Sequence, residues 1–329
     1  MDKQPLISVV TPCYNGGRYL PDYFRGILDQ KHRNIELIFV DDGSTDDTAS
    51  VAAKFGERLE ENGMRFRYIR QEHLGQAAAI NRGLAVCQGE YLTWLDADDI
   101  MLPENLSKKL AYLEEHPDCG FVFSEAVLVD ADDPGRVIGR MKRVVPAGDD
   151  PLFSDLIERR NVVWGPGTVL VRRSCMDEAF PSRRIYEGRE GQNIQLLLPL
   201  AFLFRCGYVG EALLQCVLHT DSHSRQRRSL KELLAREEGI LENYLETIKT
   251  IPRMTAAQRA LYGRQARIAG NRFNAMNAGS KWNYGKFRRY VRLLKNDGYF
   301  LSREERFWMY IPKRIKNWHT KLKRILNRG

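Results

Sequence analysis

The sequence predicts an α/β fold, with a Rossmann-like mixed, mainly parallel sheet flanked by helices and a helical, basic C-terminal extension. Two observations predict the sheet: apolar runs alternate with helix-like segments in the first half of the chain, and each apolar run ends in polar residues. A third predicts the extension, because the chain reads as almost entirely helical from residue 229 onward. With 329 residues, 43% of them apolar and 28% charged, the chain has room for one large domain and a smaller one.

The first strand is predicted at residues 6–12, an apolar run that ends at a proline and suits a strand buried on both faces. The elements that follow in this half are a helix at 18–29, strands at 35–40 and 66–69, a helix at 76–87 and a strand at 90–95. Ligands of such sheets bind beyond the carboxyl ends of the strands. We therefore expect three polar strand ends to converge on one site: 11–15, 41–42 and 96–99.

Beyond residue 125 the pattern is mixed. It predicts a strand at 167–171, a helix at about 190–204 and a strand at 213–218, which we expect to complete the sheet. We place the domain boundary near residue 225, with the α/β domain at 1–225 and a helical region at 226–329.

The six cysteines indicate reduced core thiols, because they are scattered through apolar stretches without CxxC or zinc-site spacing. The N-terminus enters a short strand directly, without the pattern of a signal peptide, so we expect a cytoplasmic protein. The longest apolar run, at 196–204, is about half of what a membrane-spanning helix needs.

Positive charge is concentrated at the C-terminal end. The formal net charge is +9, but residues 281–329 hold 15 Lys and Arg against 3 Asp and Glu, which leaves the rest of the chain slightly acidic. This tail also holds three of the five tryptophans, and apolar positions recur at helical spacing between 313 and 328. The pattern predicts an amphipathic helix on an anionic membrane surface. The alternative is an ordinary amphipathic helix docked on the α/β domain, and nucleic acid is disfavoured because no binding motif accompanies the charge.

Asp96, Asp98 and Asp99 follow an apolar strand. Three carboxylates this close repel one another unless a cation, or a ligand that brings one, neutralises them, and hard oxygen ligands suit Mg²⁺ or Mn²⁺. The alternative is an acidic turn that caps the helix starting near Pro103. The sequence contains neither the GxGxxG turn of dinucleotide-binding folds nor the GxxxxGK[ST] motif of P-loop proteins, which argues against both classes.

Four segments together resemble the family 2 glycosyltransferases of the GT-A fold: Val9–Asn15 (VVTPCYN), Val40–Asp46 (VDDGSTD), Gly75–Gly83 (GQAAAINRG) and Gly89–Asp99 (GEYLTWLDADD). The resemblance covers residues 5 to about 225. It implies nucleotide-sugar binding by residues 1–125 and an acceptor side at 126–225.

The resemblance also implies roles for particular residues. The residues that would line the nucleoside pocket are Thr11, Pro12 and Tyr14. Either Asp41 or Asp42 would accept a hydrogen bond from the uracil imide. Asn81 and Arg82 would lie near the ribose and phosphates. Asp96–Ala97–Asp98 matches the metal-binding DxD motif, with Asp98 the more direct ligand and Asp96 nearer the ribose.

Inverting members of the family use one carboxylate to take the acceptor proton. The usual Glu-Asp pair is Glu190–Gly191 here, so the base is Glu190 or, as the weaker alternative, Glu187. The segment 219–225 resembles the loop that folds over the diphosphate, which makes His219 a candidate third metal ligand and Arg225 a phosphate contact.

The resemblance thus implies an inverting, Mg²⁺- or Mn²⁺-dependent hexosyltransferase. It would move a sugar from a nucleotide-diphospho-sugar, with UDP favoured, to a lipid-linked or cell-envelope glycan, at the inner face of the cell membrane. A non-catalytic nucleotide-sugar-binding scaffold subunit and a nucleotidyltransferase are the competing hypotheses.

Overall fold

A computed structural model describes residues 4–133, 135–145, 151–219 and 228–310. The chain separates into two compact units, one formed by residues 1–226 with 250–253 and the other by 227–249 with 254–329. Each unit is described by itself.

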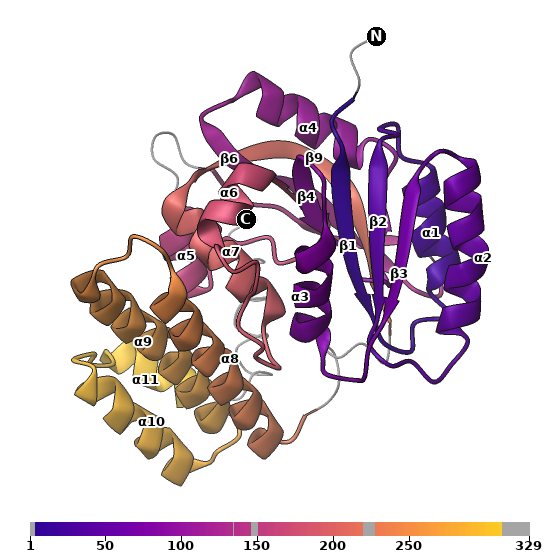
Figure 1. Cartoon of the computed structure of the whole chain (residues 1–329). Coiled ribbons are helices and arrows are strands. Elements are labelled where there is room, and N and C mark those ends of the chain that lie inside the picture. Colours follow the sequence, from indigo (N-terminus) through magenta and orange to yellow (C-terminus); the bar gives the residue numbers. More distant parts are fainter. Residues whose placement is uncertain (1–3, 134, 146–150, 220–227, 311–329) are drawn as a thin grey trace, which may run out of the picture. The chain divides into compact units, whose positions relative to one another are not determined.

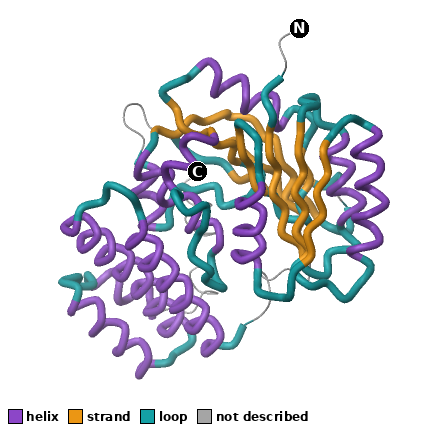
Figure 2. The backbone as a smooth tube through the Cα atoms, viewed as in Figure 1, coloured by secondary structure: helices purple, strands orange, loops and turns teal. Residues whose placement is uncertain are grey.

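The first unit contains one sheet, to which nine strands belong in the described ranges (Figures 1 and 2). Its order is β3-β2-β1-β4-β8-β6-β9-β5, and β7 pairs with β6. The strands are β1 (Ile7–Cys13), β2 (Ile35–Asp41), β3 (Arg65–Arg70), β4 (Tyr91–Trp94), β5 (Ile100–Met101), β6 (Cys119–Asp130), β7 (Val137–Met141), β8 (Val169–Arg172) and β9 (Arg205–Leu218).

The half of the sheet that contains β1 is parallel. Strand β1 pairs in parallel with β2 on one side and β4 on the other, and β2 pairs in parallel with β3. The helices of this half are α1 (Leu20–Leu28), α2 (Thr48–Glu61) and α3 (Gln76–Val86). Helix α4 (Asn105–Glu115) precedes β6. Both β1 and β2 are fully buried, which is why their sequences are continuous apolar runs.

Helices α1 and α2 cover one face of these strands, and α3 covers the other (Figure 1). Val9 belongs to the core that α1 and α2 share, whereas Val10 faces Gly83 of α3. Neighbouring residues of a strand point to opposite faces, so this alternation fixes which side each helix covers.

The other half of the sheet is mixed. Strand β8 pairs antiparallel with both β4 and β6, while β6 and β9 are parallel to each other. The described fold therefore matches the mixed sheet that the sequence predicts, but β6 was not foreseen and β9 is longer than the predicted strand at 213–218. The connecting helices are α5 (Leu152–Glu158), α6 (Arg173–Ala179) and α7 (Gln192–Leu203).

The second unit is helical in its described part. Its elements are α8 (Leu230–Thr250), α9 (Ala256–Ser280), α10 (Tyr284–Asn296) and α11 (Arg303–Tyr310). Thr255 forms a capping box with Gln258 at the start of α9, and the Asn283 side chain caps α10. Across the described helices, none has a stretch apolar enough and long enough for a membrane span.

Candidate functional site

The carboxyl ends of three neighbouring strands form one edge of the sheet. Cys13 of β1 is in register with Asp41 of β2, and Val10 of β1 is in register with Trp94 of β4. The backbone N–H of Leu95 continues this pairing by donating to the Val10 carbonyl at 3.0 Å. The segments that begin at Tyr14, Asp42 and Asp96 therefore leave the sheet side by side, as the sequence predicts for parallel strands.

The acidic segment after β4 is crowded. Burial and the neighbouring Asp98 charge raise the pKa of Asp96 to about 7, and burial also raises the pKa of Asp98. Asp99 is buried, and burial together with the other two carboxylates raises its pKa well above the usual value. Its Oδ1 atom accepts from the Val217 backbone N–H at 3.2 Å, so Asp99 ties the segment to β9. This leaves Asp96 and Asp98 as the carboxylates that are less buried.

These carboxylates fit a divalent cation that arrives with phosphates. Within the residues that are described, no three His, Cys, Asp or Glu side chains converge as a ready-made metal site. Mg²⁺ in nucleotide sites is commonly held by one or two carboxylates, with substrate phosphates and waters supplying the other ligands. A cation beside Asp96 and Asp98 would also stabilise their charged forms, which burial disfavours and which, at Asp96, the Asp98 charge disfavours further.

Asp41 and Asp42 are both buried but differ in their hydrogen bonds. Asp41 accepts from the Ser44 backbone N–H at 2.7 Å and from the Tyr68 hydroxyl at 2.5 Å. The Asp42 carboxylate has four partners: Gln71 Nε2 at 2.6 Å, Leu74 N–H at 3.0 Å, Gly75 N–H at 2.9 Å and His73 Nδ1 at 2.9 Å. A carboxylate offers about four acceptor positions, so Asp42, with three hydrogen bonds and the His73 contact, is more fully engaged by the 71–75 loop than Asp41, which has two hydrogen bonds and Arg70 Nε at 3.9 Å.

Tyr14 provides an exposed aromatic ring at this edge. Its side chain is 47% exposed, and its ring stacks on His73 with centroids 3.9 Å apart. The other two predicted pocket residues are buried: Pro12 lies in β1, and the Thr11 hydroxyl bonds to Tyr23 within the core at 2.5 Å. The side chain that faces solvent here is therefore that of Tyr14.

Asn81 links α3 to the segment before α7. Its Oδ1 atom accepts from the Ile185 backbone N–H at 2.7 Å, and its Nδ2 atom donates to the Ile185 carbonyl at 3.0 Å and to Glu187 Oε1 at 2.9 Å. Arg82, the next residue, is exposed on α3. The structure thus gives Asn81 a positioning role that the sequence does not reveal, because its partners are about a hundred residues away.

The two candidate bases lie in different surroundings. Hydrogen bonds from Asn81 and then from Arg184 lower the pKa of Glu187 below its usual range. Glu190 is half-buried and comes just before α7, where Gly191 adopts a positive φ of 72°. This left-handed conformation favours glycine, which gives a physical reason for Gly191 at the place of the family's second acidic residue.

The first turn of α7 is hydrogen-bonded to β4, the strand that precedes the acidic segment. Trp94 Nε1 donates to Asn193 Oδ1 at 3.0 Å, and Asn193 Nδ2 donates to the Trp164 carbonyl at 2.8 Å. Trp94 precedes Asp96 by two residues, so this bridge connects the segment that carries Glu190 with the segment that carries the acidic cluster.

His219 follows β9 and reaches the same region. Its ring lies 4.1 Å from the Tyr19 ring, and its charge is close enough to oppose the rise in the pKa of Asp98. Arg225, the other residue predicted in this loop, lies outside the described residues.

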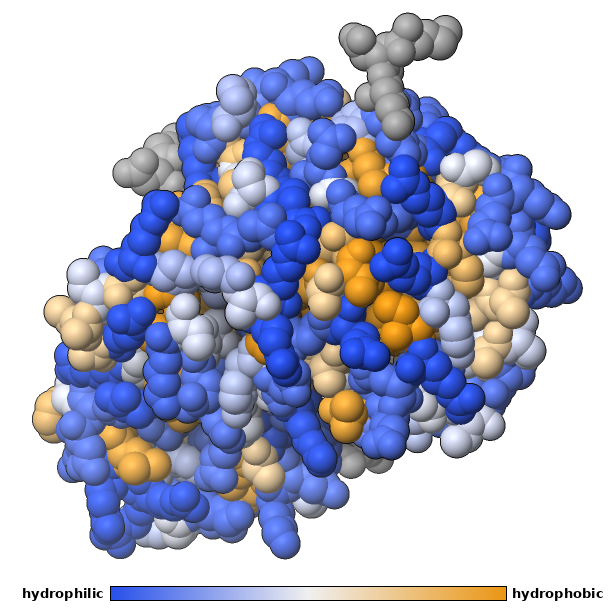
Figure 3. Space-filling model, in the orientation of Figure 1, coloured by the Kyte–Doolittle hydropathy of each residue, from blue (hydrophilic) through white to orange (hydrophobic). Residues whose placement is uncertain are grey.

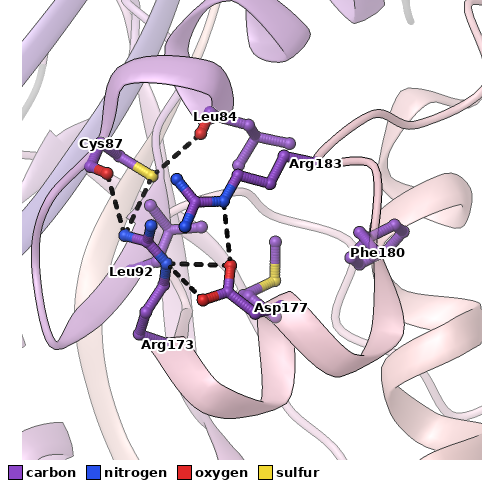
Figure 4. Close-up of a pocket in the computed structure, with 8 residues that line it drawn as sticks. Leu84, Cys87, Leu92, Arg173, Asp177, Phe180 and Arg183 are labelled. Atoms are coloured by element: carbon purple, nitrogen blue, oxygen red, sulfur yellow. Dashed lines mark hydrogen bonds and ion pairs between the residues drawn. The ribbon is translucent and has the colours of Figure 1, made fainter.

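Figure 4 shows a small cavity at the amino end of β4, and Arg173 and Arg183 both point to Asp177 beside it. Its volume of about 10 Å³ has room for about one water molecule. It is lined by Leu84, Cys87, Leu92, Arg173, Met176, Asp177, Phe180 and Arg183. The cavity is too small for a nucleotide.

Several residues around the site were missed by sequence reasoning. Gln76 Nε2 donates to Asp96 Oδ1 at 2.8 Å, and Tyr68, His73 and Asn193 make the contacts described above. Gln76 and His73 do lie in or beside the Gly75–Gly83 segment, which was a usable signal. Tyr68 and Asn193 are brought to the site by tertiary pairing alone.

Residues 8–140 match the family described as "Glycosyl transferase family 2". The match covers about two fifths of the chain, so residues 8–140 resemble a family 2 glycosyltransferase domain. Among similar proteins, TuaG of Bacillus subtilis (strain 168), whose name assigns it to teichuronic acid biosynthesis, is 32% identical over 52% of this chain and 63% of its own. Glycosyltransferase GlyG of Streptococcus pneumoniae serotype 4 is 41% identical over 39% of this chain and 41% of its own. The chain thus spans less than two thirds of the length of these relatives.

Solved structures identify the fold as GT-A. Residues 1–349 of TarS from S. aureus match 92% of this chain and 88% of that chain, with a TM-score of 0.59 and 17% identity. TarS in complex with UDP-GlcNAc matches with a TM-score of 0.57 at 15% identity, covering 90% of this chain and 93% of that chain. Mannosyltransferase PcManGT from Pyrobaculum calidifontis, in complex with GDP-Man and Mn²⁺, matches 94% of this chain and 84% of its own, with a TM-score of 0.54 at 15% identity.

Proposed function

We propose that this protein is an inverting, divalent-cation-dependent glycosyltransferase that uses a nucleotide-diphospho-sugar. The observation that carries the proposal is the convergence of Tyr14, Asp41 and the Asp96–Asp98 pair at one edge of the sheet, in a domain that resembles family 2 glycosyltransferases. The exposed Tyr14 ring suits stacking on a nucleobase, and Asp41 suits the imide N–H of that base. The crowded Asp96–Asp98 pair suits a cation that accompanies a diphosphate.

The base of the nucleotide would stack on Tyr14, and Asp41 would accept from a uracil imide. Asp41 is the better acceptor because Asp42 is more fully engaged by the 71–75 loop. A relative of the same fold binds UDP-GlcNAc and another binds GDP-Man, which supports a nucleotide-sugar donor and makes the nucleobase the first property to measure.

Mg²⁺ or Mn²⁺ would be held by Asp98, with Asp96 nearer the ribose and His219 as a further ligand. The cation supplies charge neutralisation for the departing diphosphate. Arg82, on the exposed side of α3, and Arg225 would add positive charge for the phosphates. Mn²⁺ in the structure of PcManGT supports this assignment.

Glu190 would take the proton from the acceptor hydroxyl. Glu187 is the weaker candidate because its carboxylate is engaged by Asn81 and Arg184 and its pKa is lowered. A good general base has a pKa near the working pH, and lowering the pKa moves a carboxylate away from that range. The acceptor oxygen would then bond to the anomeric carbon as the bond to the nucleoside diphosphate breaks, and a single displacement of this kind inverts the configuration of that carbon.

We place the acceptor at a membrane, as a lipid-linked or cell-envelope glycan. The basic, aromatic composition of residues 281–329 supports a peripheral position on the inner face of an anionic membrane. The assignment of TuaG to teichuronic acid biosynthesis supports an envelope glycan.

A second candidate function is a nucleotide-sugar-binding subunit without transfer activity. Gly191 at the place of the family's second acidic residue favours it. Donor-dependent turnover that is lost in Glu190→Gln, with donor binding retained, would exclude this candidate.

Titration calorimetry with UDP, GDP and their sugar conjugates tests the donor site. We expect one nucleotide class to bind in the presence of Mn²⁺ and at least about tenfold more weakly with EDTA or in Asp98→Asn, because the cation bridges protein and diphosphate. Asp22→Asn, an exposed carboxylate of α1 that pairs with Arg25, is the matched control and should bind like the unaltered protein. Absence of binding by every nucleotide in the presence of metal would refute the proposal.

A further inference from the structure

The outer face of α10 (Tyr284–Asn296) carries a row of basic side chains. Tyr284, Arg288, Arg292 and Lys295 are all exposed. At about 100° of rotation per residue, they fall within a sector of about 80° of the helix surface, along a length of about 17 Å. These four residues are called the α10 stripe below.

The opposite face of α10 is already occupied. Phe287, Tyr290 and Leu294 are buried in the core of the helical unit. The apolar face is therefore not available to enter a membrane, and the α10 stripe is the surface that this helix presents to another molecule.

The α10 stripe has no counter-charges of its own. On α9, Arg267 pairs with Asp297 at 2.8 Å and Arg272 pairs with Glu305 at 2.8 Å. By contrast, in the described part of the chain no carboxylate lies within 4.0 Å of the basic groups of Arg288, Arg292 or Lys295. Arg267 and Arg272 are therefore neutralised locally, whereas the three basic side chains of the stripe have no such partner.

Aromatic side chains accompany the charge at the amino end of α10. Trp282 is 62% exposed and Tyr284 is 57% exposed, and the Arg288 guanidinium lies 5.6 Å from the Tyr284 ring. Trp and Tyr beside Lys and Arg are typical of the headgroup region of a bilayer. In the view of Figure 3, the surface around α10 is mainly hydrophilic.

We propose that the α10 stripe docks the protein on an anionic lipid bilayer, with the axis of α10 parallel to the membrane plane. A straight row of unpaired charges on one helix face fits a flat anionic surface along its whole length, and the exposed aromatic residues favour a lipid headgroup over a nucleic acid. The inference rests on the proposed function, which places transfer at a membrane surface. It differs from insertion of residues 313–328 because attachment through α10 is electrostatic and weakens with salt.

The test uses the full-length chain and two variants with equal loss of charge. The stripe variant carries Arg288→Gln, Arg292→Gln and Lys295→Gln. The control variant carries three exposed changes in the first unit, Lys54→Gln, Arg65→Gln and Arg67→Gln. Glutamine is a good helix former, which suits the stripe positions and Lys54, and Arg65 and Arg67 are exposed on strand β3, so both variants should melt within a few degrees of the unaltered protein. Residues 311–329 are present in all three proteins and contribute equally.

Partitioning is measured by co-sedimentation with vesicles of phosphatidylcholine mixed with phosphatidylglycerol, and with vesicles of phosphatidylcholine alone. We expect about fivefold weaker partitioning per lost charge, or roughly 100-fold for the stripe variant, and less than about threefold for the control. Equal partitioning of the two variants would overturn the inference. So would a stripe variant that binds vesicles normally but loses affinity for double-stranded DNA.

Separate experiments test membrane docking and nucleotide-sugar binding, so either can be refuted without the other. Nucleotide titration in solution uses no vesicles, and we expect both variants to bind the donor like the unaltered protein. Vesicle binding that depends on the stripe, in a protein that binds no nucleotide, would support the docking surface and refute the transferase.

Discussion

The exchange of Glu190 for Gln, compared with that of Glu187, tests which carboxylate acts as the base. Gln keeps the size of the side chain but cannot take a proton. Removing a general base slows turnover by about 10²–10⁴-fold, which corresponds to about 3–5 kcal/mol of activation free energy. We expect this loss for Glu190→Gln. For Glu187→Gln we expect less than about tenfold, because hydrogen bonds from Asn81 at 2.9 Å and Arg184 at 2.8 Å already occupy its carboxylate.

The assay follows release of the nucleoside diphosphate under saturating donor, with calorimetry of donor binding as the control. Glu190→Gln should bind the donor normally, since the base contacts the acceptor. If Glu187→Gln abolishes turnover while Glu190→Gln retains it, the assignment of the base is wrong. If both variants turn over normally, neither residue is the base.

Three further predictions concern stability. Burial raises the pKa of Asp96 to about 7, so the folded protein keeps a proton that the unfolded chain has lost, and stability should fall by about 3 kcal/mol as the pH rises from about 4 to 7. Asp96→Asn should flatten this dependence in calorimetric melting with EDTA, and an unchanged slope would contradict the pKa. The side chains of Arg143 and Asp155 are almost fully buried and 3.3 Å apart, and Asp155 also pairs with Arg160 at 3.3 Å, so Arg143→Met should cost about 1–3 kcal/mol in urea unfolding; a neutral effect would contradict a stabilising buried pair. Gly83→Ala would place its Cβ atom 2.3 Å from Val10 Cγ1, and we expect about 1–3 kcal/mol of destabilisation in the same assay, whereas a neutral effect would show that α3 can shift away from β1.

The parallel half of the sheet could be predicted because each of its strands leaves a local signal. Ile7–Cys13 and Ile35–Asp41 are buried on both faces and are continuous apolar runs, and parallel strands need helical crossovers that add a helix pattern between them. The positions of Tyr14, Asp41 and Asp96 at one edge follow from the same rule.

The second half of the sheet could not be predicted equally well. Antiparallel pairing of β8 with β4 and β6 requires no helical crossover, so the alternation of strand and helix disappears from the sequence. The first part of β9 (Arg205–Leu218) contains Gly207 and Gly210 and charged residues, and its pairing with β6 shifts register near Glu125. Because of these irregularities, the first part of β9 lacks the regular apolar pattern from which a strand is predicted.

The roles within the site required the structure. The sequence predicts that Asn81 lies near the ribose and phosphates, but its amide holds Ile185 and Glu187 in the structure. The sequence also treats Asp41 and Asp42 as equivalent, and the backbone N–H groups of Leu74 and Gly75 distinguish them. Such contacts join residues far apart in the chain and leave no pattern in either segment.

We infer that the carboxyl edge of β1, β2 and β4 binds a nucleotide-diphospho-sugar with a divalent cation. A crystal structure of the 329-residue chain with Mn²⁺ and the nucleotide that calorimetry selects tests this inference. We expect the base on the Tyr14 ring beside Asp41, and Mn²⁺ between the diphosphate and Asp98, bonded to the Asp98 carboxylate. A nucleotide bound elsewhere on the protein, or at this edge without contact to Asp98 through a cation, would contradict it.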